Sequence, residues 1–193
     1  LVEFDGYNPK GKISGLLEGS AMDSACIVRG VCGQSGAVVA LGFSENKENM
    51  EAYRMALFSM AISKVKFASL FGLTIRKEAW PTYGLPQNIV FDRGPGSTMG
   101  VPIRSETLAR GEMMSWLSRL ELTPTHSGQS KATVESSHPR TKSNNDQPTH
   151  FHSSLNFVDI CKRHILQAIY DNDSSGSEGK MTPEMLDVGF SPT

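Results

Sequence analysis

An aspartate ends an apolar run in the stretch "NIVFDRGPGS", residues 88–97. Asp92 follows directly after Phe91, and the chain then turns through Arg-Gly-Pro-Gly. A carboxylate at the end of a buried strand is costly unless a positive group meets it, such as an arginine, a lysine or a metal ion. For one such aspartate taken alone, a helix cap or an Asx turn is the simpler interpretation. The other acids of the chain therefore have to be considered with it.

Two further acids stand in positions that could bring them to Asp92. Asp5 occupies the centre of "LVEFDGY", and Glu135 stands in "KATVESSH". If their elements pack together, three carboxylates converge, and neighbouring like charges raise one another's pKa. Divalent cations remove this conflict, because Mg²⁺ prefers hard oxygen ligands and commonly takes only a few carboxylates. Two such ions ~3.5–4 Å apart can catalyse phosphoryl transfer.

The elements that must position these acids alternate between strands and helices. Residues 1–7 are predicted as a strand, and residues 24–32 and 36–44 as a hairpin around the turn "GQSG". Residues 49–71 have apolar side chains at helical spacing without Gly or Pro, which predicts one long amphipathic helix that closes at Gly72. Its methionines are expected to fill the core.

The second half of the chain continues the alternation. We predict a short buried strand at 88–92, a helix at 104–119, a strand and loop at 120–128, a helix that carries Glu135, and an amphipathic helix at 155–172. This order predicts an α/β fold with a mixed sheet and helices on both faces.

Composition limits the classes of protein. The 193 residues are 38% hydrophobic and 20% charged, as in a single soluble domain. No apolar run approaches the ~20 residues that span a bilayer. Three cysteines without CxxC spacing are expected to be reduced thiols. The segment from Arg54 to Lys77 holds five basic residues and no acid, for which a solvated face is the simplest interpretation.

The segments around the three acids resemble a known family. "EFDGY", "VFDRGPGS" and "THSGQSKATVESSHPR" are similar to the three acidic motifs of the integrase-core DDE transposases, which include Mu-like and Tn-family bacterial transposases and are relatives of retroviral integrases. In that family the second acid is followed by Asn or Arg, Gly and Pro, and the third follows a Gly-x-x-Lys-x-x-Val-Glu pattern. The resemblance implies a ribonuclease H-like fold with a mixed five-stranded sheet flanked by helices on both faces.

The resemblance also implies a role for each site residue. Asp5 and Asp92 would share two Mg²⁺ or Mn²⁺ ions in the presence of substrate, and Glu135 would hold one of them. Lys131 would contact a DNA phosphate, although a pair with Glu135 one helical turn away is the simpler interpretation. Basic side chains that would contact the DNA backbone are Arg93, His138 and Arg140.

Partners and organisation follow from the same resemblance. Residues 1–175 would form the catalytic core, and residues 176–193 a linker towards a further domain. The core would act on transposon ends and target DNA as a homo-oligomer, with accessory transposition proteins, in the bacterial cytoplasm near the nucleoid and away from the membrane.

Some alternatives remain open. The segment between Asp92 and Glu135 is longer than in many integrases, which leaves Glu106 and Glu112 as substitutes for the third acid. They are less attractive than Glu135 because neither has the Gly-x-x-Lys context. A ribonuclease H-like nuclease is a second enzymatic interpretation. A catalytically degenerate integrase core that only binds DNA or assembles with partners is a third.

Overall fold

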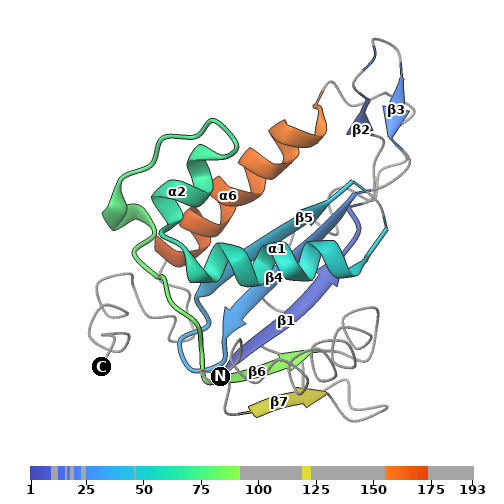
Figure 1. Cartoon of the computed structure of the whole chain (residues 1–193). Helices are drawn as coiled ribbons and strands as arrows, with labels where there is room; N and C mark the ends of the chain where they lie inside the picture. The colour runs from blue at the N-terminus through green and yellow to red at the C-terminus, as the bar shows by residue number, and fades with distance from the viewer. Residues whose placement is uncertain are drawn as a thin grey trace.

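The computed structural model describes residues 1–9, 13–15, 17, 20–22, 25–45, 47–91, 119–122 and 155–173. Its strands are β1 (Val2–Tyr7), β2 (Ile13–Ser14), β3 (Ala21–Met22), β4 (Cys26–Cys32), β5 (Val38–Ser44), β6 (Asn88–Phe91) and β7 (Arg119–Leu122). Its helices are α1 (Met50–Ala61), α2 (Lys64–Ser69), the short 3₁₀ helix η1 (Lys77–Ala79) and α6 (Phe157–Asp173) (Figure 1).

Five strands form one mixed sheet in the order β5-β4-β1-β6-β7. The pairs β4–β5 and β1–β4 are antiparallel, whereas β1–β6 and β6–β7 are parallel. The predicted hairpin is confirmed as β4 and β5. Its turn places Gly36 at φ 68°, a conformation that glycine adopts without strain.

Helix α1 covers one face of this sheet. Its small residues Ala52 and Ala56 and the ring of Tyr53 are fully buried against apolar side chains of β1, β4, β5 and β6. Gly42 of β5 permits this close approach, because a Cβ at that position would lie 1.8 Å from the Ala52 carbonyl oxygen. The helix therefore packs almost directly on the backbone of β5.

The other face is covered by α2 and α6, which form a second core with β4 and β5. Trp80 is buried in it, and its Nε1 donates a hydrogen bond to the Val38 carbonyl oxygen at 2.9 Å. Asn172 of α6 donates to the same oxygen at 2.9 Å and accepts from the Val38 amide at 2.8 Å. The end of α6 is therefore joined to the edge strand β5.

The prediction of one continuous helix from 49 to 71 was wrong. The helix breaks at Ile62, which is extended (φ −103°, ψ 162°), and Ser63 starts α2 by accepting a hydrogen bond from the Lys66 amide. The apolar period continues through the break, so a sequence pattern cannot reveal it. The side chain of Lys64 folds back and donates to the Ser59 carbonyl oxygen at 2.7 Å, which stabilises the end of α1.

The remaining predicted elements have mixed outcomes. The strand at 1–7, the strand at 88–92 and the helix at 155–172 are confirmed as β1, β6 and α6 within a residue or two. Arg119, predicted as the end of a helix, begins β7 instead. The rest of the predicted helix at 104–119 and the helix around Glu135 lie outside the described residues. No helix in the described ranges is both long and apolar enough to cross a membrane.

Candidate functional site

Asp5 lies in the middle of β1, at the centre of the five-stranded sheet. Its neighbour Phe4 is buried on the α1 face and pairs in parallel register with Phe91 of β6. The two phenyl rings are in contact, with centroids 5.2 Å apart. Because side chains alternate along a strand, Asp5 points to the opposite face, which α6 covers. Its side chain is half-buried.

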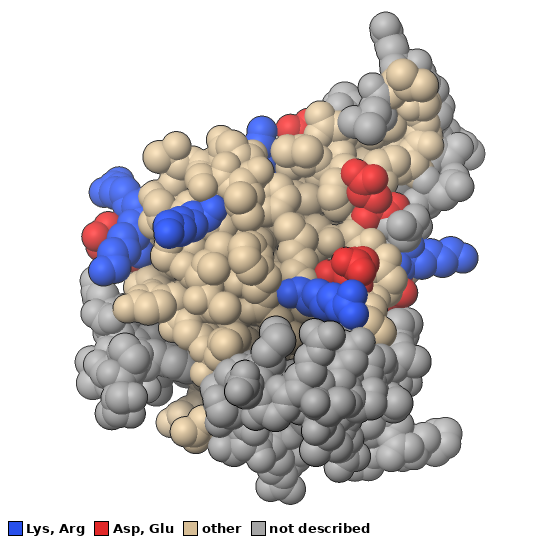
Figure 2. All heavy atoms as spheres, viewed as in Figure 1, with Lys and Arg blue, Asp and Glu red and all other residues tan. Residues whose placement is uncertain are grey.

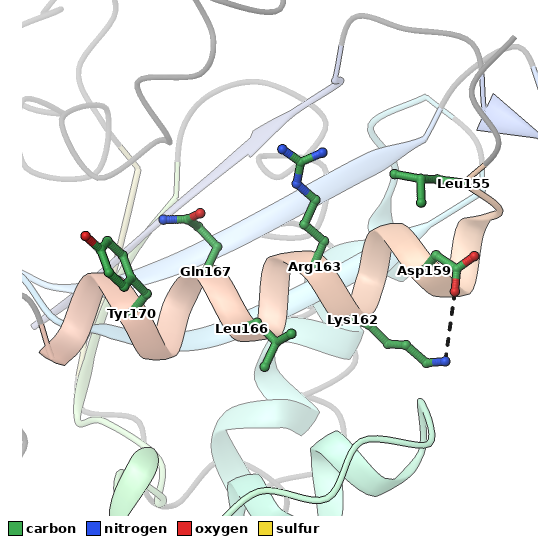
Figure 3. A pocket seen from close by; sticks show the side chains of 7 residues that line it. All are labelled: Leu155, Asp159, Lys162, Arg163, Leu166, Gln167 and Tyr170. Carbon is green, nitrogen blue, oxygen red and sulfur yellow. Dashed lines mark ion pairs between the residues drawn. The ribbon is translucent and has the colours of Figure 1, made fainter.

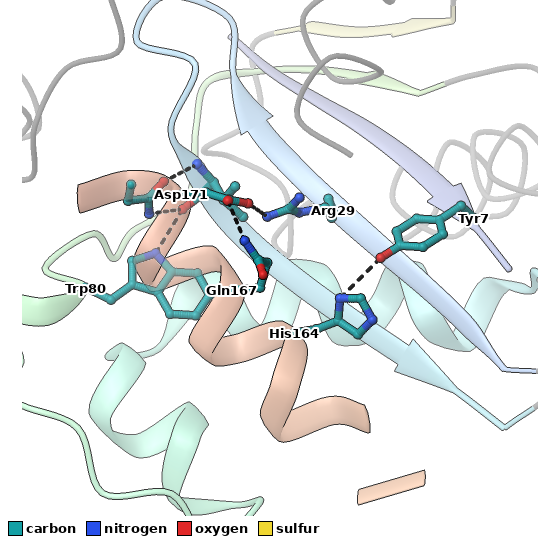
Figure 4. A network of polar contacts seen from close by, with 8 residues as sticks. Tyr7, Arg29, Trp80, His164, Gln167 and Asp171 are labelled. Carbon is teal, nitrogen blue, oxygen red and sulfur yellow. Dashed lines mark hydrogen bonds and ion pairs between the residues drawn. The ribbon is translucent and has the colours of Figure 1, made fainter. Parts of the chain in front are cut away.

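Arg29 of β4 is the antiparallel partner of Asp5, so both residues lie on the α6 face of the sheet. The Arg29 side chain is only 1% exposed, and its Nη2 lies 2.6 Å from Asp171 Oδ2 of α6. Gln167 Nε2 donates to the other oxygen of Asp171 at 2.8 Å (Figure 4). The buried guanidinium of Arg29 therefore lies beside β1 and links α6 to the sheet through its ion pair with Asp171.

Tyr7, two residues beyond Asp5, makes a second connection to α6. Its hydroxyl oxygen lies 3.2 Å from His164 Nδ1, and the two rings meet edge to face (Figure 4). Burial raises the pKa of Tyr7 well above its ordinary value, and the nearby charge of Arg29 opposes this shift. The phenol is therefore neutral at physiological pH.

Glu48 is an acid near Asp5 that the sequence motifs did not indicate. It accepts a hydrogen bond from the Tyr53 hydroxyl, and a Cβ on Gly6 would lie 2.9 Å from its Oε1. Burial, and then the charges of Glu48 and Asp5, raise the pKa of the Cys26 thiol to about 12. The two carboxylates thus lie near the same thiol. Glu48 stands in a polar loop just before a helix, and no motif marks it.

The other predicted site residues cannot be placed relative to Asp5. They lie outside the described residues: Asp92, Arg93, Lys131, Glu135, His138 and Arg140, together with the substitutes Glu106 and Glu112. Within the described ranges, no group of three or more His, Cys, Asp or Glu side chains could hold a metal ion. The three cysteines, as expected, are free thiols, and all are buried.

The basic run from Arg54 to Lys77 does not form one surface. Lys64 is 1% exposed, whereas Arg54 lies on the outer side of α1 and pairs with Glu51 at 3.3 Å. On the face seen in Figure 2, several basic side chains gather beside an acid at the left edge, and the other basic side chains lie apart from them. The prediction of a solvated face therefore holds for Arg54 and fails for Lys64.

Comparison with protein families gives a match over most of the chain. Residues 18–148 match the model of the TnsB C-terminal domain. The chain belongs to this family. Membership supports the predicted relationship to Tn-family transposases. The matched range includes Asp92 and Glu135, begins after Asp5, and ends before α6. Among curated proteins, none matches this chain.

Proposed function

We propose that this chain is the catalytic core of a DNA transposase with a ribonuclease H-like fold, a metal-dependent polynucleotidyl transferase. The observation that carries the proposal is the parallel register of β1 and β6. Phe4 pairs with Phe91, and the next residue in the sequence is an aspartate in both strands, Asp5 and Asp92. Membership in the TnsB C-terminal domain family and the strand order of the sheet add support.

The chemistry of the donor set fits Mg²⁺ or Mn²⁺. Asp5, Asp92 and Glu135 offer hard carboxylate oxygens, the ligands that these ions prefer. Asp5 is half-buried on a sheet face, so a cation can meet it without being taken fully out of water. Two bound ions would activate an attacking oxygen and stabilise the leaving oxygen of a phosphodiester.

The residues of the chain would hold and orient the substrate. Asp5, Asp92 and Glu135 would hold the ions, and Lys131 would contact a phosphate beside them as a point charge. Arg93, His138 and Arg140 would contact the DNA backbone and give salt-dependent binding without sequence preference. We further propose that the core assembles as a homo-oligomer on transposon ends and target DNA, with accessory transposition proteins.

The test is calorimetric titration of the chain with Mg²⁺ and Mn²⁺, with nicking of a supercoiled plasmid measured alongside. Asp5→Asn and Asp92→Asn should each lower metal affinity by about tenfold or more. Even the substitution of a residue that only hydrogen-bonds a metal ligand lowers metal affinity by about this factor. Both variants should lose nicking. Asp173→Asn is the matched control, because Asp173 is an exposed acid at the end of α6 and should change neither readout.

Equal metal binding in wild type and both variants would overturn the proposal, provided that circular dichroism shows all proteins folded. The chain would then be a degenerate core that acts by DNA binding or assembly. If the Asp5→Asn variant still nicks the plasmid, Asp5 is not part of the metal site.

A further inference from the structure

A surface groove of about 490 Å³ runs along α6. Its lining includes Lys162, Arg163, Leu166, Gln167 and Tyr170, all from this helix. Figure 3 shows Arg163, Gln167 and Tyr170 pointing to one side of α6, and Lys162 and Leu166 to the other. The groove thus combines cations, an amide and an exposed aromatic ring.

Several of these side chains are exposed, although the inner side of α6 is well packed. Tyr170 is 67% exposed and Leu166 is 51% exposed, whereas Cys161, Ile165 and Ala168 on the inner side are fully buried. Arg163 is also exposed. Lys162 lies 3.9 Å from Asp159, a weak pair at the helix surface. On the side of α6 that carries Gln167 and Tyr170, the charged residue of the lining is therefore Arg163.

The groove lies on the side of the sheet to which Asp5 points. Arg163 adjoins His164, which reaches Tyr7, and the charge of Arg163 acts on the Tyr7 hydroxyl. Gln167 adjoins the ion pair between Asp171 and Arg29, the register partner of Asp5. The helix that carries the groove is thus held to the strands around Asp5 through His164 and Asp171.

We propose that this groove binds an unpaired DNA strand, with a phosphate on Arg163 and a base stacked on Tyr170. The inference rests on the proposed function and extends it to a substrate-binding surface. Arg163 and Tyr170 are two helical turns apart, or ~10 Å, so the strand would run along the helix. An exposed ring and a cation are the chemistry that binds single strands, because every base has a π-face and every nucleotide a phosphate. A base inside a duplex could not stack in this way.

The test is fluorescence anisotropy of a labelled oligothymidylate of about 12 nucleotides with the whole chain in EDTA, over a range of salt concentrations. Arg163→Gln should weaken binding about fivefold and reduce the slope of log affinity against log salt by about 0.7. Tyr170→Ala should weaken binding about tenfold without changing the slope, and Tyr170→Phe should retain binding. Lys77→Gln, at an exposed lysine of η1, is the control and should stay within about twofold of wild type.

Two outcomes would overturn the proposal: an equal loss in Lys77→Gln, and unchanged oligonucleotide binding in Tyr170→Ala. If that Tyr170→Ala variant also changes the sedimentation coefficient, the groove is a protein contact surface instead. A wild-type chain that binds the oligonucleotide through Arg163 and Tyr170 but neither binds metal nor nicks the plasmid would count against the proposed function alone. A wild-type chain that nicks the plasmid but whose oligonucleotide binding does not depend on Arg163 and Tyr170 would count against the groove alone.

Discussion

Lys64 is a buried lysine in the second core. It is 1% exposed, its Nζ donates to the Ser59 carbonyl oxygen, and the same atom lies 5.4 Å from the centroid of the Trp80 ring. Burial lowers its pKa to about 7, from an ordinary value of 10.5. Between these two values the unfolded state binds more protons than the folded state, so the free energy of unfolding should rise with pH.

Lys64→Met should abolish this rise and stabilise the protein at pH 7. In wild type, the free energy of unfolding should rise by at most about 1.4 kcal/mol per pH unit between pH 7 and 10.5, and should not rise below pH 7. The gain should be about 1 kcal/mol, because an apolar side chain of similar length replaces a buried charge but removes the hydrogen bond to the Ser59 carbonyl oxygen. Urea denaturation at several pH values measures both effects.

Lys66→Met is the control for this prediction. Lys66 is exposed one half-turn further along α2, and its replacement should change stability by less than about 0.5 kcal/mol at every pH. If the free energy of unfolding of wild type does not change from pH 7 to pH 9, the pKa of Lys64 is not lowered by burial.

At the scale of elements, the contact between α1 and β5 depends on one glycine. Gly42→Ala would bring a Cβ to 1.8 Å from the Ala52 carbonyl oxygen and 2.6 Å from the Ala56 amide nitrogen. Both are backbone atoms, so the helix as a whole must shift. We expect a loss of about 3 kcal/mol in the free energy of unfolding, measured by urea denaturation.

Gly33→Ala is the matched control, because the nearest atom to its Cβ would be Glu3 Oε1 at 3.5 Å, an ordinary contact. Its effect should be within about 0.5 kcal/mol. A Gly42→Ala variant as stable as Gly33→Ala would show that α1 does not pack on β5 as described.

At the scale of the whole molecule, α6 completes the second core. It buries Cys161, Ile165 and Ala168 beside Trp80, and Asn172 bonds both backbone groups of Val38. A chain that ends at residue 154 should lose cooperative thermal unfolding and bind the dye ANS, because this core would be exposed. A chain that ends at residue 175 keeps α6 and should unfold as the full chain does.

The two truncations also test the predicted domain boundary at residue 175. If the chain ending at 154 unfolds in a single sharp transition without binding ANS, the second core does not need α6. If the chain ending at 175 is already unfolded, the boundary lies further along the chain.

Several local features followed from the sequence because they depend on near neighbours. Two runs rich in strand-forming residues and the turn "GQSG" between them predicted the β4–β5 hairpin, and helical spacing predicted α6. The candidate site was recognised through short motifs around Asp5, Asp92 and Glu135. Of these three, Asp5 lies in the described part of the chain, within the predicted strand.

Other features were decided by contacts between residues far apart in the chain. The Arg29–Asp171 ion pair joins positions 142 residues apart, and no local period indicates it. The break at Ile62 and the burial of Lys64 follow from the packing of α2 on Phe43, Trp80 and α6. Glu48 reaches Gly6 because the connection from β5 to α1 returns across the end of β1. Most strands and helices can be placed from the sequence, since that choice depends mainly on side chains a few residues apart, but the break at Ile62 and the start of β7 at Arg119 cannot. Which charges are buried together depends on tertiary packing, because it requires knowing which faces meet.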